Sequence, residues 1–218
     1  MCAIINAPMH FLFRCGYYTA TGRECTHFFS FNFNINSNNL YWIIKMIDIE
    51  LILLELDSIK YILDKQKANR NPNDLSRDVA GLYDDAYCLQ SVKGCSDAFY
   101  ATGAMSWYDH KEIEFNNFIF DQLKYTNSII EELGLYRTRV LTLKPKTCYN
   151  FHKDNGPRIH IPLITNDDCI FIIDDKIHRF PADGNYYYVD TTKKHSAMNG
   201  SQIDRIHLVG CIHEKLLV

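Results

Sequence analysis

The sequence lacks the features that mark several common classes of protein. No apolar run approaches the roughly 20 residues that a membrane-spanning helix needs, and the formal net charge of -3 comes without a long run of one sign. A dedicated nucleic-acid binder would show a basic patch, so we expect small molecules or proteins as partners. The segment 4–13 is interrupted by polar residues, and no small-residue cleavage site follows it. We therefore expect no secretory signal and a cytoplasmic location.

The cysteines show no pairing pattern. All eight are scattered, without a CxxC motif among them, so the sequence predicts neither a zinc ribbon nor a disulfide framework. We expect mostly buried thiols in a reducing compartment. The length of 218 residues and the hydrophobic content of 47% fit one globular domain with room for an appended element.

Residues 1–45 differ from everything after them, because they are rich in Phe, Asn, Cys and Tyr and almost free of charge. They show neither a helical period nor clear hairpin punctuation. Two interpretations are a poorly ordered N-terminal extension and translated sequence upstream of a start at Met46. A third, one strand of a sheet, rests on the alternation of Phe29, Phe31, Phe33 and Ile35.

Two amphipathic helices are predicted in the segment 46–136. From Ile47 to Lys65 the apolar residues recur on one helix face, at Ile52, Leu56, Ile59 and Leu63. Asp109 and Glu112 have capping-box spacing, and the pattern after them predicts a second helix that ends at Gly134. We assign no firm element to residues 75–105. The segment 46–136 is expected to pack on the core and to form a lid, drawn from residues 91–108 with the loop 155–157.

After Gly134 the periodicity is that of strands. Turn residues separate short apolar or alternating runs, which predict strands at 139–143, 148–151, 158–164, 169–174, 176–180, 186–189 and 203–212. Many short strands at close spacing indicate a barrel or a double-sheet jelly roll. We expect a mainly β core at 137–212, a tail at 213–218, and helices that cover the outside of a sheet.

Two histidines and a carboxylate in this core have the order that a metal site requires. His152 and Asp154 are two apart, and residues two apart on a strand point to the same side, so both can converge on one ion. His195 lies two or three strands later and can return to the same end of a rolled barrel. Three such ligands on one face of a metal are typical of non-haem Fe(II) oxygenases. The short HxD pattern is common, however, and also occurs at surfaces and in turns.

At these residues the sequence resembles the aspartyl/asparaginyl β-hydroxylase-like group of 2-oxoglutarate and Fe(II)-dependent oxygenases, which also takes in free-proline hydroxylases. The resemblance covers about 137–212. It is carried by Leu143-Lys144-Pro145, Arg158 to Leu163 with Thr165-Asn166, Asp183-Gly184, His195-Ser196 with Asn199, and Arg205 to Leu208. Together with the strand pattern it indicates a double-stranded β-helix core (jelly-roll, cupin-like) with flanking α-helices on its outside.

The resemblance implies roles for four residues directly. His152, Asp154 and His195 would hold Fe(II). Arg205 would hold the distal carboxylate of 2-oxoglutarate, because a guanidinium binds a carboxylate through two parallel hydrogen bonds that lysine cannot reproduce.

For four further residues the implied role is less direct. Arg158 and His160 match a pair that faces the cosubstrate in the protein hydroxylases, but alternate residues on a central strand can instead face the substrate or support the ligands. His207 shares the strand face of Arg205 and is expected to support it. Asn199 is expected to hold a turn behind His195.

The implied activity is the O2-dependent hydroxylation of an amino-acid side chain (Asp, Asn or Pro, free or within a protein or peptide), with release of succinate and CO2. An alternative is a non-catalytic cupin-like module that binds a metal or a small acid. A zinc hydrolase would need a general base, and the sequence offers no HExxH or comparable motif. The substrate and the oligomeric state are left open.

Overall fold

The computed structural model describes residues 46–69 and 85–212, together with four short strands nearer the N-terminus. Those strands form two antiparallel pairs, β1 (Cys15–Tyr18) with β2 (Glu24–His27) and β3 (Phe31–Asn32) with β4 (Ile43–Ile44). The possible strand at 29–35 is described only in part, as β3. The rest of 1–45, residues 70–84 and the predicted tail 213–218 lie outside the described residues.

The first predicted helix is present as two consecutive helices, α1 (Ile49–Ser58) and α2 (Lys60–Ala68). The buried face is the predicted one, with Ile52, Leu56, Ile59 and Leu63 all buried. The break lies at Ile59. Just before it, the Ser58 hydroxyl donates to the carbonyl of Glu55 at 2.6 Å, which is the kind of local bond that competes with a regular helix.

The predicted second helix is much shorter than 109–134. Only α4 (Lys124–Glu132) is helical, and it ends before Gly134, which has a φ of +62°. Between 109 and 123 the chain forms a 3₁₀ turn, η2 (Glu112–Glu114), and then β7 (Asn117–Phe118), which pairs with β6 (Gln90–Ser91). The capping box is formed by Lys111 and Glu114, not by Asp109 and Glu112: the Glu114 carboxylate accepts from the backbone N–H of Lys111 at 2.6 Å.

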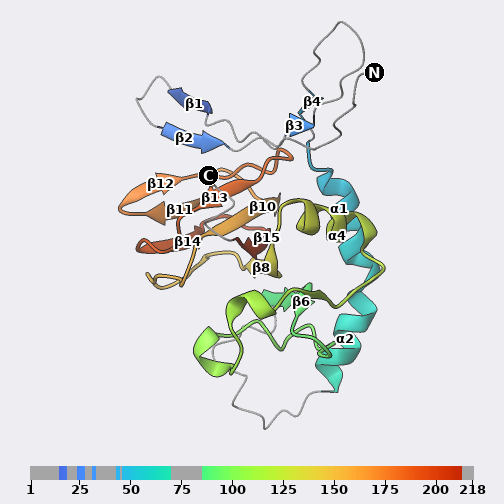
Figure 1. The fold of residues 1–218 in the computed structure, drawn as a ribbon. Coiled ribbons are helices and arrows are strands. Elements are labelled where there is room, and N and C mark those ends of the chain that lie inside the picture. The colour runs from blue at the N-terminus through green and yellow to red at the C-terminus, as the bar shows by residue number, and fades with distance from the viewer. Residues whose placement is uncertain are drawn as a thin grey trace, which may run out of the picture.

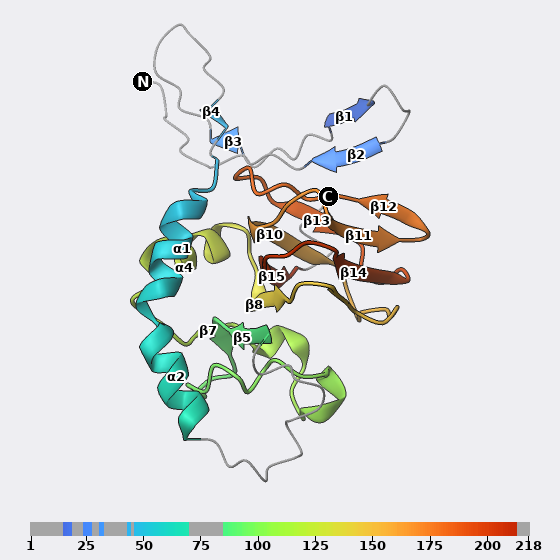
Figure 2. The ribbon, with the colours of Figure 1, turned by 180° about the vertical axis from the view of Figure 1, so that it is seen from behind.

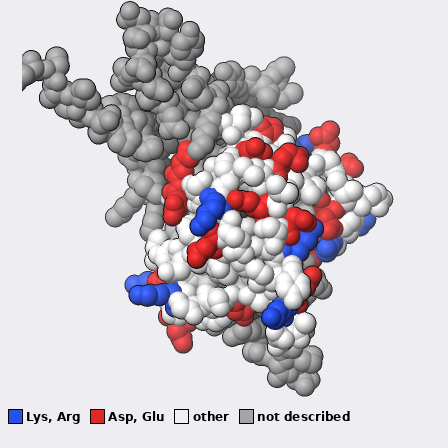
Figure 3. Space-filling view, turned by 90° about the vertical axis from the view of Figure 1, so that its right-hand side faces the viewer, with Lys and Arg blue, Asp and Glu red and all other residues white. Residues whose placement is uncertain are grey.

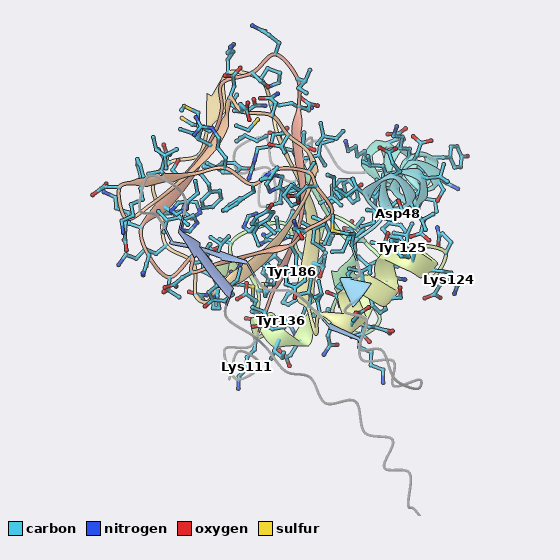
Figure 4. The ribbon with its side chains drawn as sticks, turned by 90° about the horizontal axis from the view of Figure 1, so that it is seen from above. Asp48, Lys111, Lys124, Tyr125, Tyr136 and Tyr186 are labelled. Atoms are coloured by element: carbon cyan, nitrogen blue, oxygen red, sulfur yellow. The ribbon has the colours of Figure 1, made fainter. Side chains whose placement is uncertain are left out.

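Helix α1 also supplies the cap that α4 lacks. The Glu55 carboxylate accepts from the backbone N–H groups of Tyr125 and Thr126, both at 2.8 Å, and a negative charge is favourable at a helix N-terminus. The backbone N–H of Asp48 donates to the Tyr125 hydroxyl at 2.8 Å, and Figure 4 shows the two residues side by side. These polar contacts hold the two helices together.

Two antiparallel sheets form the core. One has the order β13 (Tyr187–Val189), β10 (Arg158–Ile164), β15 (Arg205–Cys211), β8 (Tyr136–Leu143), β5 (Ala86–Cys88). The other has the order β12 (Lys176–His178), β11 (Cys169–Ile173), β14 (His195–Asn199), β9 (Thr147–Cys148). From β8 to β15 the chain passes back and forth between the sheets. This is the predicted double-stranded β-helix, or jelly roll.

The larger sheet has one apolar face and one face that mixes polar and apolar residues. Ile159, Ile161 and Leu208 belong to the same buried cluster as Ile52 of α1 and Ile130 of α4, so the helices cover the outside of this sheet as predicted. In Figures 1 and 2 α1 and α2 form a long rod along one side of the molecule, with β11, β12 and β14 on the other. The inner face therefore carries the alternate positions, where Arg158, His160, Arg205 and His207 lie among apolar residues.

The strand pattern predicted most of this core, with one omission that matters. Strand β10 has the predicted bounds, and most other predicted strands differ only at their ends, but of the strand predicted at 148–151 only Cys148 belongs to β9. Strand β14, which carries His195, was not predicted, because Ser196 and Asn199 give it neither alternation nor β-branched residues. Strand β5 extends the core sheet by residues that precede 137. The segment 46–136 therefore holds short strands between its helices.

The remaining expectations concern thiols and surface charge. Five cysteines are free: Cys95 and Cys148, and the buried Cys88, Cys169 and Cys211. No described helix is long and apolar enough to cross a membrane. On the face drawn in Figure 3, acidic and basic side chains of the described residues are interspersed, without a continuous basic patch.

Replacing Gly210 by alanine tests the packing of the outer face. A Cβ atom at Gly210 would lie 2.8 Å from Cδ1 and 2.9 Å from Cβ of Leu135. Because overpacking forces side chains and backbone to shift, we expect Gly210→Ala to lower the free energy of unfolding by about 1–3 kcal/mol, measured by urea denaturation. Gly156→Ala is the control, since its Cβ would meet only Arg158 at 3.8 Å. Equal stability of the two variants would contradict the close contact.

Candidate functional site

His152 and His195 are brought together by their own backbones. The two residues form an antiparallel bridge, in which the N–H of His152 donates to the carbonyl of His195 at 3.0 Å and the N–H of His195 donates back at 2.9 Å. Side chains directly opposite in such a pair lie on the same side. The two imidazole rings accordingly lie with their centroids 4.3 Å apart.

Both imidazoles are oriented by the same kind of hydrogen bond. Nδ1 of His152 lies 2.7 Å from the carbonyl of Asn150, and Nδ1 of His195 lies 2.9 Å from that of Lys193. A carbonyl accepts only, so each ring carries its proton on Nδ1 and offers the Nε2 lone pair to a ligand. Burial lowers the pKa of His195, which favours the neutral form that binds metals.

Asp154 completes the cluster. Its backbone N–H donates to the carbonyl of Thr191 at 2.8 Å, and its Oδ1 lies 4.0 Å from Nε2 of His152. Each of His152, Asp154 and His195 has one ligand atom within 4.8 Å of those of the other two. The structure therefore places the three predicted ligands around one point.

Three other predicted site residues form a buried network. Arg205, His207 and His160 all lie on the inner face of the larger sheet and are at most 5% exposed. Nη2 of Arg205 lies 3.0 Å from Nδ1 of His207, and Nδ1 of His160 lies 3.3 Å from the same atom. A guanidinium can only donate, so Nδ1 of His207 is the acceptor and its proton lies on Nε2. This Nε2–H is buried and has no hydrogen-bond partner.

Phe171 connects this network to the candidate metal ligands, and nothing in the sequence identified it beyond its place in a buried run. Its ring stacks on His195 with centroids 5.6 Å apart, meets the edge of His160 at 5.3 Å and lies under the guanidinium of Arg205 at 6.0 Å. One aromatic ring thus packs against three predicted site residues, which all belong to one continuous site.

Arg158 faces carboxylates of this chain. Its Nη2 lies 2.9 Å from Oε1 of Glu112 and its Nε lies 3.3 Å from Oδ2 of Asp154. Glu112 is therefore part of the site, although its spacing suggested a helix cap. Asn199 is the last residue of β14. Its amide donates to the carbonyls of Leu143 and Ile203, both at 2.8 Å, and so holds the turn into β15. The lid expected from 91–108 and 155–157 stays a prediction.

Burial determines which of the inner-face side chains carry a charge. It lowers the pKa of Arg205 to about 10, so the guanidinium stays protonated at neutral pH, and no described carboxylate forms an ion pair with it. Burial also lowers the pKa of His160 and of His207 well below 6.5, with the charge of Arg205 acting in the same direction. Both imidazoles are neutral at pH 7, and the positive charge is concentrated on the arginines.

The fold and the cluster define a jelly-roll protein with a candidate site of two histidines and one carboxylate. The model of the family described as "Aspartyl/Asparaginyl beta-hydroxylase" matches residues 98–213, which is more than half of the chain. The protein belongs to this family. No curated protein sequence matches it.

Similar solved structures share only part of the chain. One is a predicted oxalate decarboxylase from Thermotoga maritima (21% identity, TM-score 0.31), aligned over 39% of this chain and 71% of that one. Another is a Cupin 2 conserved barrel domain protein from Salinispora arenicola (14% identity, TM-score 0.30), with 37% and 65% covered. The plu4264 protein from Photorhabdus luminescens has 19% identity and a TM-score of 0.31, with 36% and 62% covered, so the chain spans less than two thirds of its length.

The two buried neutral histidines predict a loss of stability in acid. Their pKa values are depressed on folding, whereas histidines of an unfolded chain have a pKa of about 6.5. As the pH falls below 6.5 the unfolded state therefore binds protons that the folded state does not, which costs up to about 1.4 kcal/mol per pH unit for each histidine. Urea denaturation between pH 7.5 and 5 should show a weaker pH dependence for His160→Gln than for the wild type. Identical dependences would refute buried, neutral His160.

Proposed function

We propose that the protein is a 2-oxoglutarate- and Fe(II)-dependent dioxygenase that hydroxylates an amino-acid side chain and releases succinate and CO2. The observation that carries the proposal is the convergence of His152, Asp154 and His195 within 4.8 Å, in a chain of the aspartyl/asparaginyl β-hydroxylase family. The substrate class, Asp, Asn or Pro, free or within a peptide, is part of the proposal.

The donor set fits Fe(II). Two neutral imidazole nitrogens and one carboxylate oxygen are the facial ligands of non-haem iron oxygenases, which leave the remaining positions open. The two Nδ1 bonds to backbone carbonyls fix the ring orientation before any ion binds, as the supporting bonds of metal-binding histidines do. When bound, the iron and its cosubstrate supply the oxidising chemistry.

The buried network fits a cosubstrate with two carboxylates. Arg205 is buried without a carboxylate partner among the described residues, and the Nε2–H of His207 is a buried donor without a partner. A carboxylate beside Arg205 would supply the anionic partner that this buried guanidinium lacks. Phe171, which packs between Arg205 and His195, would line the path from this carboxylate to the metal.

The assignment of ligands is tested by His195→Ala. Purified protein given Fe(II), 2-oxoglutarate and O2 should release succinate, and a panel of free and peptide-bound Asp, Asn and Pro should identify the substrate by a gain of one oxygen in mass spectrometry. His195→Ala should abolish turnover and iron binding, while His178→Ala on strand β12 should keep both. Unchanged turnover in His195→Ala would overturn the ligand assignment. Iron binding without O2-dependent succinate under any substrate would instead favour a non-catalytic module, and zinc in anaerobically purified protein would favour a hydrolase.

The role of Arg205 is tested separately. Arg205→Lys keeps the charge but loses the two-pronged geometry, so we expect the KM for 2-oxoglutarate to rise about tenfold. Arg205→Met should raise it by at least about 30-fold, because losing one partner of a buried charge pair costs about 2 kcal/mol or more. Lys144→Met, which removes a half-exposed lysine paired with Asp204, serves as the control. Unchanged KM values in both Arg205 variants would show that the distal carboxylate binds elsewhere.

A further inference from the structure

Glu112 joins two buried arginines at the edge of the candidate metal site. Its Oε1 lies 2.7 Å from Nη1 of Arg137 and 2.9 Å from Nη2 of Arg158. Both arginine side chains are 4% exposed and that of Glu112 is 14% exposed. Burial alone would raise the pKa of Glu112, but the charges of Arg158 and Arg137 outweigh it and hold this pKa below its ordinary value. The carboxylate is therefore ionised.

Arg158 lies between this carboxylate and Asp154. Its Nη2 faces Glu112, and its Nε lies 3.3 Å from Oδ2 of Asp154. The contact with Asp154 does not have hydrogen-bond geometry, because the buried Nε has no hydrogen-bond partner. Arg158 thus binds Glu112 closely and Asp154 loosely. The other carboxylate oxygen of Asp154, Oδ1, is the one near His152.

The sharing of Arg158 matters for metal binding, because a guanidinium and a metal ion compete for the same carboxylate charge. Arginine does not lose its proton in proteins, so without Glu112 the positive charge of Arg158 would be balanced by Asp154 alone. Buried charges require a partner, and Asp154 would then be held closely by Arg158. A carboxylate bound in this way is a weaker ligand for a cation.

We propose that Glu112 is a positioning residue that sets the metal affinity of the site by neutralising Arg158 and so leaving Asp154 to the metal. This inference rests on the proposed function, because it requires His152, Asp154 and His195 to be ligands. Glu112 comes from η2, outside the jelly-roll core, and the role of this turn is to complete the charge balance of the centre.

Arg137 fixes Glu112 in place and connects it to the segment 101–115. Arg137 has a φ of +49°, an unfavourable conformation for a residue with a side chain. It donates from Nε to the carbonyl of Ala101 at 3.3 Å and from Nη2 to the carbonyl of Gly103, while its backbone N–H donates to the carbonyl of Phe115 at 2.6 Å. In Figure 4 Lys111, just before η2, and Tyr136, at the start of β8, lie at the same end of the molecule. The segment 101–115 is thereby attached to the site.

The test measures metal affinity directly, with Co(II) as a probe whose visible absorption reports its coordination. Supporting partners of metal ligands typically contribute about 10- to 100-fold in affinity, so Glu112→Gln should raise the Kd for Co(II) by at least about tenfold. Glu114→Gln is the matched control, because Glu114 lies on the same turn but binds the backbone of Lys111 at the surface. Its Kd should equal that of the wild type.

A double variant separates this role from a merely structural one. If Glu112 acts through the charge of Arg158, then Glu112→Gln combined with Arg158→Gln removes both the neutralising group and the competitor, and the Kd should return towards the wild-type value. Additive losses would overturn the proposal. Should Glu112→Gln fail to fold, Arg158→Gln alone provides the test. Removing the competing charge leaves Asp154 to the metal, so the Kd should not exceed the wild-type value, and a clearly raised Kd there would refute the proposal.

Failure of this inference is distinguishable from failure of the proposed function. A wild-type protein that binds no Co(II), or an Asp154→Ala variant that binds it as tightly as the wild type, would remove the metal site itself. A wild type that binds Co(II) through Asp154, together with a Glu112→Gln variant of unchanged affinity, would leave the metal site intact and reject only the role of Glu112.

Discussion

The two backbone hydrogen bonds between His152 and His195 are the constraint on which the candidate site depends. They extend the pairing of β9 with β14 after a one-residue shift in register, and they fix which side of the chain both imidazoles occupy. Asp154 follows at the next position on that side. A shift of this pairing by one residue would turn His195 to the other face of its strand. Because the register is set by the sheet as a whole, the packing of the jelly roll, and not the local sequence around each ligand, determines whether a metal can bind.

The two faces of the larger sheet have different roles: the outer face contributes to stability, and the inner face carries the polar groups of the candidate site. The outer face is apolar and is covered by α1 and α4, so the hydrophobic contribution to stability lies on the side away from the ligands. The inner face can then carry buried polar groups, which are costly unless they are paired. Phe171 of the second sheet supplies much of the apolar contact that these groups have. His195, His160 and Arg205 are held against one ring, which helps to fix their relative positions together with the hydrogen bonds that each of them forms.

The sequence predicted those elements in which apolar residues recur with a regular period. The alternation in β10 predicted a strand and the helical face of Ile52, Leu56 and Ile59 predicted burial on one side. The structure confirms the strand, which is buried on both faces, and the buried helical face. The order of His152, Asp154 and His195 predicted a metal cluster, and they do converge. Glu112 could not be identified, because its partners Arg137 and Arg158 are 25 and 46 residues away and no local pattern records that contact. The predicted helix failed at the same place, since a continuous helix from Asp109 would exclude β7 from its pairing with β6.

The charge of the inner face limits which ligands the protein can accept. By the register of β8, β15 and β10, Arg139, Val209 and His160 lie in one row on the same face, and Arg158 and Arg205 occupy that face as well. The carboxylates of Glu112 and Asp154 offset part of this positive charge, and both of them contact Arg158. The buried Nε of Arg139 has no hydrogen-bond partner, and Arg205 forms no ion pair with any described carboxylate. Guanidinium groups cannot relieve this imbalance by losing protons. Ligands that carry carboxylates would therefore balance the positive charge of the interior, whereas cationic ligands without a carboxylate would be repelled by the arginines.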